Sequence, residues 1–240
     1  MKYLALFDWD KTVRKNYACT NWLEMIVESK KVSKDLLKEN GEVYQKYLKG
    51  DIDHNELTEQ GMAVYGKYIK DVKKEDLLPV LEEYKVKDEG NIFDIMKQDI
   101  FPFLEKNNIK IIVISGAQQE LIELYKEELK IDEIYAVEYK LENGIYTDNY
   151  INNGLDENKQ KIIDNLLKIK ENKILFAFGD SISDIPLLKA ADKCFINNTK
   201  TKFNGLENEE YFDFNNKENG KIIVNEMEEI LKKYGGRKYV

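Results

Sequence analysis

Four short runs of consecutive apolar residues constrain the fold of this 240-residue chain more than any other feature. They are residues 2–7, 109–115, 173–179 and 193–196. Apolar residues at successive positions are typical of strands that are buried on both faces of a sheet. Helical patterns alternate with these runs, at residues 117–130, 159–170 and 182–190. The alternation predicts an α/β fold, with a Rossmann-like parallel sheet and helices on both of its faces.

The segment from Val13 to about Asp88 interrupts this alternation, because it contains no good strand. Its apolar residues recur at helical spacing. Within it, Asp53-His54-Asn55-Glu56 resembles a capping box, in which an N-cap Asp is followed three residues later by Glu. We therefore expect a helical cap inserted directly after the first strand. The expected division is a Rossmann-like catalytic core of residues 1–14 and 89–240 and a helical cap of residues 15–88.

Three further elements complete the expected fold. Residues 91–107 are expected to form the helix that returns to the sheet, with Pro102 bending or interrupting it. Residues 137–148 are expected to form a hairpin whose turn contains Asn143-Gly144. The last helix is expected at residues 217–234.

Composition and charge narrow the classes of function. The net charge of −8 weighs against a general binder of nucleic acid or anionic membranes, because such proteins are basic. Cys19 and Cys194 are far apart in sequence and suggest neither a metal pair nor a disulfide framework, so a cytoplasmic location is expected. The first apolar run ends at Asp8, too early for a signal peptide, and no run approaches the roughly 20 residues of a membrane span.

Polar residues that can carry chemistry follow the predicted strands at their carboxyl ends. They are Asp8, Asp10 and Thr12 after the first strand, Ser115 and Gly116 after the second, Asp180 and Asp184 after the third, and Lys159 at the start of the preceding helix. Ligands of open parallel sheets bind beyond the carboxyl ends of the strands. If the strands are neighbours, these residues meet in one crevice.

The residue types in this crevice indicate its ligands. Four aspartates without a histidine or cysteine form an oxygen-only donor set, which favours Mg²⁺ over Zn²⁺. A lysine, hydroxyl groups and backbone N–H groups at helix starts suit an anion such as phosphate. A metal beside a phosphate site indicates phosphoryl transfer, with one Asp as nucleophile and a second as general acid and base.

These residues also carry a family resemblance. DWDKT resembles the first motif of the haloacid dehalogenase (HAD) superfamily, Ser115 after IIVI its second, Lys159 its third, and GDSISD its fourth. The helical insertion is similar to that of the class whose cap lies between motifs one and two. The resemblance implies a HAD-like catalytic core and spans nearly the whole chain.

The resemblance implies a role for each matching residue. Asp8 would be the nucleophile and Asp10 the general acid and base. Mg²⁺ would bind the Asp8 carboxylate, the backbone carbonyl of Asp10, and Asp180, while Asp184 would hold the metal shell or Lys159. The phosphate would be bound by the Ser115 side chain, the Gly116 N–H and Lys159, and Thr12 would orient Asp10. Lys161 is the rival for the position of Lys159.

Asp10 also separates branches of the superfamily. The resemblance implies phosphate-ester chemistry, because the dehalogenases lack this second Asp. The cap and the hairpin resemble the phosphoserine phosphatase-like group. In that group's phosphoserine enzymes, a cap Glu and a cap Arg grip the substrate, but here Tyr17 stands at the Glu position and the only arginines are Arg14 and Arg237. Arg14 and Tyr17 are therefore candidate substrate-binding residues, with packing as their alternative role.

The expected function is a Mg²⁺-dependent phosphatase that hydrolyses a small phosphorylated metabolite through an aspartyl-phosphate. The expected partner is this small-molecule phosphate ester, with no nucleic acid or membrane, and the chain is expected to be a monomer or homodimer. The enzymatic alternatives are a phosphotransferase or mutase and a phosphoserine phosphatase proper. A phosphate-sensing receiver-like protein is the non-enzymatic alternative, but receivers are about half this length and have no cap.

Overall fold

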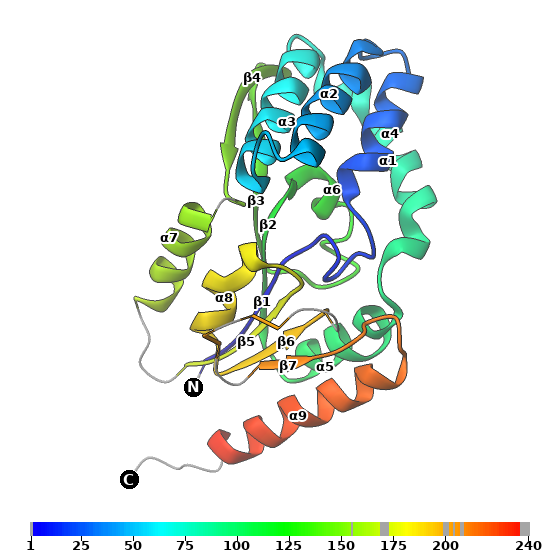
Figure 1. Cartoon of the computed structure of the whole chain (residues 1–240). Coiled ribbons are helices and arrows are strands. Elements are labelled where there is room, and N and C mark those ends of the chain that lie inside the picture. Colours follow the sequence, from blue (N-terminus) through cyan, green and yellow to red (C-terminus); the bar gives the residue numbers. More distant parts are fainter. Residues whose placement is uncertain are drawn as a thin grey trace.

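The computed structural model describes residues 2–154, 156–168, 173–198, 202–203, 205–206 and 209–235. In this part of the chain, seven strands form one sheet in the order β4-β3-β2-β1-β5-β6-β7 (Figure 1). The strands are β1 (Lys2–Phe7), β2 (Lys110–Gln118), β3 (Glu133–Glu142), β4 (Ile145–Asn152), β5 (Lys173–Gly179), β6 (Lys193–Ile196) and β7 (Glu209–Tyr211). Every neighbouring pair is parallel except β3 and β4. The predicted Rossmann-like α/β fold is confirmed.

The register of the central strands brings their carboxyl ends together. Phe7, the last residue of β1, pairs with Val113 of β2 and with Phe178 of β5. Its ring also stacks on that of Phe178, with 4.3 Å between the ring centroids. The residues that follow Phe7, Val113 and Phe178 therefore lie together near one edge of the sheet.

Two layers of helices cover the sheet, each over its own set of buried apolar side chains. On one face, Leu4 and Leu6 of β1 pack with Ile163 of α7 (Asp156–Leu167) and Leu187 of α8 (Ile185–Ala190). On the other face, the intervening residues of β1 belong to the core that includes Leu104 of α5 (Phe101–Lys106) and residues of α9 (Glu218–Gly235). The alternation of side chains along a strand divides β1 between these two cores.

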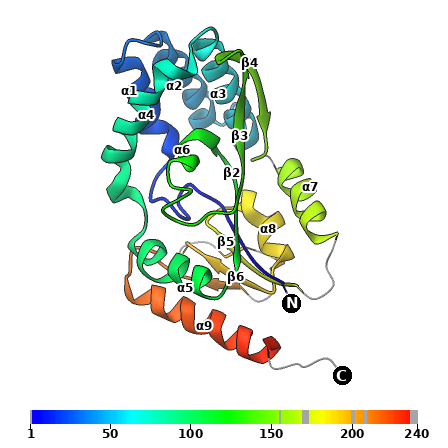
Figure 2. The ribbon, with the colours of Figure 1, turned by 180° about the vertical axis from the view of Figure 1, so that it is seen from behind.

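Four helices occupy the region between β1 and the return to the sheet. They are α1 (Ala18–Glu28), α2 (Asp35–Lys49), α3 (His54–Ile69) and α4 (Lys74–Asp88). They lie beyond the carboxyl ends of the central strands, with α3 beside the β3–β4 hairpin (Figures 1 and 2). The predicted capping box starts α3, since the Asp53 side chain accepts from the Glu56 N–H at 2.9 Å and the Glu56 side chain accepts from the Asp53 N–H at 3.0 Å.

The two connections between these helices and the sheet lie side by side. The Lys15 N–H donates to the Asn91 carbonyl at 2.7 Å, and the Phe93 N–H donates to the Val13 carbonyl at 3.0 Å.

Along the described parts of the chain, no helix has the length and apolar character needed to cross a bilayer.

The predicted helix at residues 117–130 is wrong over most of its length. Strand β2 continues to Gln118, and α6 covers only Gln119–Glu123. Residues 124–130 form turns, since the Tyr125 N–H donates to Ile122 three residues back rather than four. Tyr125 faces inward, where its hydroxyl donates to Asp88 at 2.9 Å. This buried contact competes with a regular helix.

The remaining expectations differ in detail. The helix predicted at 91–107 begins at residue 94, after a 3₁₀ turn (Glu89–Asn91). It runs through a π-helical turn (Met96–Ile100) into α5 without a break at Pro102, which lies in the first turn of α5. The hairpin is confirmed and is longer than expected, with φ of 51° at Asn143 and 80° at Gly144. The segment predicted as a helix at 182–190 begins with a 3₁₀ turn (Ile182–Asp184) before α8. Residues 169 and 170, predicted to end a helix, lie outside the described residues.

Candidate active site

Asp8 begins the site at the carboxyl end of β1. Its N–H donates to the Phe178 carbonyl at 3.0 Å, which continues the pairing of β1 with β5 by one residue. The Asp8 side chain meets the buried ammonium of Lys159, with 3.4 Å between Asp8 Oδ1 and Lys159 Nζ. The same Nζ lies 2.8 Å from Asp184 Oδ1. Carboxylate oxygens of Asp8, Asp180 and Asp184 all lie within 4.8 Å of one another.

Asp8, Asp180 and Asp184 form an acidic cluster, and Lys159 lies against it. Together these four side chains carry more negative than positive charge. Burial and the neighbouring Asp184 raise the pKa of Asp8 well above its usual value, although Lys159 opposes the shift. Burial and Asp184 also raise the pKa of Asp180 to about 7. Burial alone would lower the pKa of Lys159, but Asp184 and Asp8 more than offset this and raise it. The Lys11 ammonium also opposes the rise in the pKa of Asp180. The three carboxylates still outnumber the two ammonium groups, which leaves room for a further cation.

The loop after β5 holds Asp184 in place. Asp184 Oδ2 accepts hydrogen bonds from the N–H groups of Asp180 and Ser181, at 3.0 and 3.1 Å. A Cβ atom on Gly179 would lie only 2.7 Å from the Cβ atom of Asp184. The glycine of GDSISD therefore gives Asp184 the space to turn back onto the loop.

The donor set fits Mg²⁺, which prefers oxygen ligands and is commonly held by one or two carboxylates. Asp8, Asp180 and Asp184 offer such oxygens from two neighbouring strand ends. The Asp10 side chain lies outside this group of three, because its Oδ1 accepts a hydrogen bond from the Ala18 N–H at the start of α1, at 2.8 Å. Burial raises the pKa of Asp10 to about 6, and the Ala18 hydrogen bond opposes this rise.

The candidates for binding phosphate lie in two places. Thr12 follows β1, and Ser115 and Gly116 lie in the last part of β2. Ser115 is buried, and its Oγ accepts from the Ala117 N–H at 3.2 Å, whereas Gly116 is exposed. Thr12 is fully buried, and its Oγ1 has no hydrogen-bond partner among the described residues. A buried hydroxyl without a partner is unfavourable, so Thr12 offers a hydrogen bond to a bound group.

Gly154 is a positioning residue that sequence reasoning missed. A Cβ atom at this position would lie 2.2 Å from the Cα atom of Gly116, which leaves no room for any side chain. The segment before α7 thus packs directly on Ser115 and Gly116 of β2. The glycine itself was the only signal, and nothing in the sequence identifies its partner.

The two candidate lysines of α7 have different surroundings. Lys159 is buried against Asp8 and Asp184, whereas Lys161 is exposed, with its Nζ 3.4 Å from Asn158 Oδ1. The geometry therefore brings Lys159, and not Lys161, to the aspartates.

Arg14, a candidate for substrate binding or for packing, is buried beside the site. Its side chain is 1% exposed and forms an ion pair with Asp88, with 2.5 Å between Nη2 and Oδ1. Tyr125 and Asn91 also donate to the Asp88 carboxylate, each at 2.9 Å. Asp88 ends α4, so this pair joins the two connections to the helices. Arg14 uses Nε and Nη2 for Asp88, and its buried Nη1 has no hydrogen-bond partner among the described residues.

Tyr17, the second candidate for substrate binding, lies at the surface. Its side chain is 44% exposed, and its hydroxyl accepts a hydrogen bond from Lys11 Nζ at 2.6 Å. Lys11 has a left-handed backbone, with φ of 61°, which is uncommon outside glycine. Sequence reasoning missed Lys11, because a lysine between Asp10 and Thr12 gave no sign of this contact.

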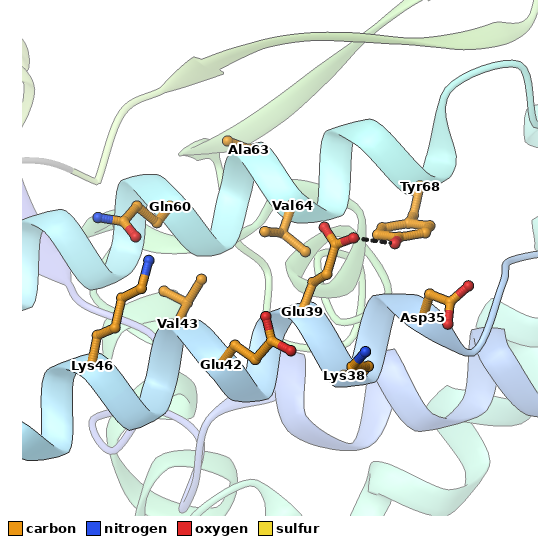
Figure 3. A pocket seen from close by; sticks show the side chains of 10 residues that line it. All are labelled: Asp35, Lys38, Glu39, Glu42, Val43, Lys46, Gln60, Ala63, Val64 and Tyr68. Carbon is orange, nitrogen blue, oxygen red and sulfur yellow. Dashed lines mark hydrogen bonds between the residues drawn. The ribbon is translucent and has the colours of Figure 1, made fainter.

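Two hollows in the surface lie away from the acidic cluster of Asp8, Asp180 and Asp184. The larger, of about 540 Å³, runs between α2 and α3 and is lined by acidic and basic residues, among them Glu42 and Lys46 (Figure 3). Its Glu39 bonds to Tyr68 and Lys67. The smaller, of about 230 Å³, lies between α1 and α4. Neither contains a residue of the acidic cluster.

Comparison with known proteins places this geometry in a family. The sequence matches the model of haloacid dehalogenase-like hydrolases over residues 5–189. No curated protein matches it in sequence.

Solved structures are similar in fold at low identity. A phosphoserine phosphatase from T. onnurineus is 20% identical with a TM-score of 0.57, over 94% of this chain and 96% of that chain. A protein of unknown function from Bordetella pertussis Tohama I is 14% identical with a TM-score of 0.66, over 82% and 90%. A HAD family hydrolase from Salmonella enterica subsp. enterica serovar Typhi is 18% identical with a TM-score of 0.57, but the match spans 81% of this chain and 61% of that one. With its family model covering most of the sequence, the chain belongs to the haloacid dehalogenase-like hydrolases.

Proposed function

We propose that this hydrolase is a Mg²⁺-dependent phosphomonoesterase that acts on a small phosphorylated metabolite through an aspartyl-phosphate on Asp8. The observation that carries the proposal is the pairing of two aspartates in different surroundings. Asp8 lies against Lys159 in the acidic cluster, while the Asp10 side chain turns away from it to the N–H of Ala18. Two carboxyl groups with separate environments suit two separate roles, nucleophile and proton carrier.

In the first step, a carboxylate oxygen of Asp8 attacks the phosphorus of the ester, and the bond from phosphorus to the ester oxygen breaks. The leaving oxygen keeps the bonding electrons and takes a proton from Asp10. The pKa of Asp10, raised to about 6 by burial, lets this group hold a proton close to neutral pH. The products of this step are the free alcohol and the aspartyl-phosphate.

In the second step, a water molecule attacks the phosphorus and the bond to Asp8 breaks. Asp10, now ionised, takes a proton from that water, and inorganic phosphate leaves. Lys159, whose Nζ lies 3.4 Å from Asp8, would neutralise charge on the phosphoryl oxygens in both steps. A Mg²⁺ ion held by Asp8, Asp180 and Asp184 would neutralise these oxygens further and orient the phosphoryl group.

We propose that residues 15–88 act as a cap that covers the site and limits the size of the substrate. Helices α1 to α4 lie beyond the strand ends that carry the aspartates (Figure 1). The first of them begins at Ala18, whose N–H binds the proposed proton carrier Asp10. A lid of this kind excludes water and restricts access to small molecules.

The similarity in fold to a phosphoserine phosphatase supports phosphatase chemistry, but the residues here favour a different substrate. Arg14 gives Nε and Nη2 to Asp88 and keeps only Nη1 without a partner among the described residues, and Arg237 is the only other arginine in the chain. Tyr17 is bonded to Lys11. Neither position therefore matches the cap Glu and cap Arg that grip the amino-acid head in phosphoserine enzymes.

Hydrolysis of p-nitrophenyl phosphate with Mg²⁺, compared with EDTA, tests the proposal. Turnover should need Mg²⁺. Asp10→Asn should lose far more activity on an alkyl phosphate than on p-nitrophenyl phosphate, whose leaving group needs little protonation. Equal losses on both substrates would argue against Asp10 as the acid. Transfer of phosphate to an added sugar, instead of water, would identify a phosphotransferase.

A further inference from the structure

Beside Ser115 and Gly116, two buried polar side-chain atoms have no hydrogen-bond partner in the described part of the chain. Among the described residues, Oε1 of Gln118 and Nδ2 of Asn152 are buried side-chain atoms without a hydrogen bond. The first is an acceptor and the second is a donor. Buried amide groups are normally satisfied, so these two atoms call for an explanation.

The sheet places the two amides on the same face. Gln118 pairs with Val137 of β3, and Val137 pairs with Asn152 of β4. Directly paired residues project their side chains to one face of the sheet. The Cα atoms of Gln118 and Asn152 are therefore two strand spacings apart, roughly 10 Å, with the buried Val137 side chain between them.

This face looks toward the cap helices. Tyr139 follows Val137 by two residues and so shares its face of β3. The Tyr139 hydroxyl donates to the Met62 carbonyl of α3 at 2.9 Å. The two amides thus lie on the side of the hairpin that the proposed cap covers.

The same amides lie close to Ser115 and Gly116, the residues of β2 that are proposed to hold phosphate. Gln118 ends the strand that carries Ser115 and Gly116. Asn152 accepts the Gly154 N–H at Oδ1, at 2.9 Å, and Gly154 packs directly on Gly116. The side chain of Asn158, the residue before Lys159, donates to the Asn152 carbonyl at 2.5 Å. Asn152 is therefore fixed by its other atoms, and only its Nδ2 is left for a ligand.

We infer that Gln118 and Asn152 read the head group of the substrate, and that the substrate is the phosphate ester of a small uncharged polyol or sugar. One hydroxyl would donate to Gln118 Oε1 and another would accept from Asn152 Nδ2, above the apolar Val137. Both amides are neutral, so the pair offers hydroxyl groups matched partners and gives an ammonium or carboxylate no opposite charge. The inference rests on the proposed phosphatase function and adds the substrate class to it.

The experiment compares substrates with and without hydroxyl groups. A series of polyol phosphates with three to five carbons, O-phosphoserine and p-nitrophenyl phosphate is assayed with Mg²⁺ for the wild type, Gln118→Leu and Asn152→Leu. The readout is the ratio of kcat/KM for the best polyol phosphate to kcat/KM for p-nitrophenyl phosphate. Damage to the proposed phosphate site lowers kcat/KM for both substrates and therefore cancels in this ratio. Loss of a contact to a substrate hydroxyl lowers kcat/KM for the polyol phosphate alone.

Each variant should lower this ratio about tenfold, the effect of one hydrogen bond to a substrate hydroxyl. Two matched controls, Gln119→Leu and Asn149→Leu, make the same changes at neighbouring positions and should leave the ratio unchanged. Gln119 instead binds Glu123, and Asn149 is exposed. An unchanged ratio in Gln118→Leu and Asn152→Leu, or a wild type that prefers O-phosphoserine, would overturn the inference alone. A wild type that hydrolyses none of these esters would overturn the proposed function, and the inference with it.

Discussion

Two groups of buried charges in this molecule differ in how they are balanced. At the strand ends, the carboxylates of Asp8, Asp180 and Asp184 lie together, and the Lys159 ammonium pairs with those of Asp8 and Asp184. At the connection to the helices, one guanidinium meets one carboxylate in the pair of Arg14 and Asp88. Both groups remove charge from water, which is unfavourable unless it is compensated.

The pair of Arg14 and Asp88 balances its charge within the protein, while Arg14 Nη1 has no hydrogen-bond partner among the described residues. Arg14 donates to both oxygens of Asp88, and Tyr125 and Asn91 supply two further hydrogen bonds. The acidic cluster does not, and its repulsion shows in the raised pKa values of Asp8 and Asp180, which burial and Asp184 cause. A balanced pair serves the structure, while a surplus of one sign marks a place where a ligand completes the balance.

The largest expected effect comes from removing the proposed nucleophile, Asp8, in the unbalanced group. Asp8→Asn should lower kcat on p-nitrophenyl phosphate by at least about a thousandfold, because a carboxamide is a poor nucleophile. The same change should not reduce the stability of the metal-free protein, since it removes a carboxylate from a repulsive cluster. Activity assays and urea unfolding in EDTA measure the two. Retained turnover would reject Asp8 as nucleophile, and a marked loss of stability would reject the cluster as unbalanced.

The opposite pattern is expected at the pair of Arg14 and Asp88. Arg14→Met should reduce the free energy of unfolding by about 3–5 kcal/mol, because it leaves Asp88 buried without its cation. The double variant Arg14→Met with Asp88→Leu should recover part of this loss. Urea titrations of the three proteins provide the measurement. A change well under 1 kcal/mol in the single variant would show that the pair contributes little to the fold.

The next largest effect is the pH dependence of stability, which is expected to come from Asp180 in the acidic cluster. The pKa of Asp180 is about 7 in the folded chain, against an ordinary value of 3.8, so between these values the folded chain binds a proton that the unfolded chain does not. Its contribution to stability therefore falls as pH rises from about 4 to 7. The stability of wild type relative to Asp180→Asn, measured by urea unfolding in EDTA, should decrease by a few kcal/mol over this range. Parallel curves for the two proteins would contradict the raised pKa.

The smallest effect is expected at an exposed carboxylate that belongs to neither group. Asp53 accepts the N–H of Glu56 and starts α3. Asp53→Ala should reduce the free energy of unfolding by about 1 kcal/mol, the usual effect of a lost helix cap. Thermal unfolding measures this loss, and kcat should not change. A larger loss of stability than in Arg14→Met would reverse the ranking of buried and exposed charges.

The sequence was most informative about the unbalanced group. Apolar runs predicted where β1 and β5 end, and the residues directly after them carry the acidic cluster. Parallel strands share one edge for their carboxyl ends, so the meeting of Asp8 with Asp180 and Asp184 followed from the order of elements. Lys159 was reached through its place before β5, but only the structure distinguished it from Lys161.

The balanced group was invisible in the sequence. Arg14 and Asp88 are 74 residues apart, and nothing in their local patterns links them. The inward turn of Tyr125 toward Asp88, which limits α6, depends on the same distant contact. Strand β7 was also missed, because Glu209, Glu210 and Tyr211 show no apolar run and pair only with β6. Such features depend on tertiary neighbours, which local patterns do not encode.

Calorimetric titration of the metal-free protein with MgCl₂ tests most directly whether the surplus charge is completed by a cation. The account predicts saturable binding of Mg²⁺ to wild type and a rise in its unfolding temperature. Both effects should be strongly reduced in Asp180→Asn and unchanged in the matched surface variant Asp148→Asn, whose carboxylate is exposed. Equal Mg²⁺ binding by wild type and Asp180→Asn, or none by either, would contradict the central claim that the acidic cluster is a magnesium site.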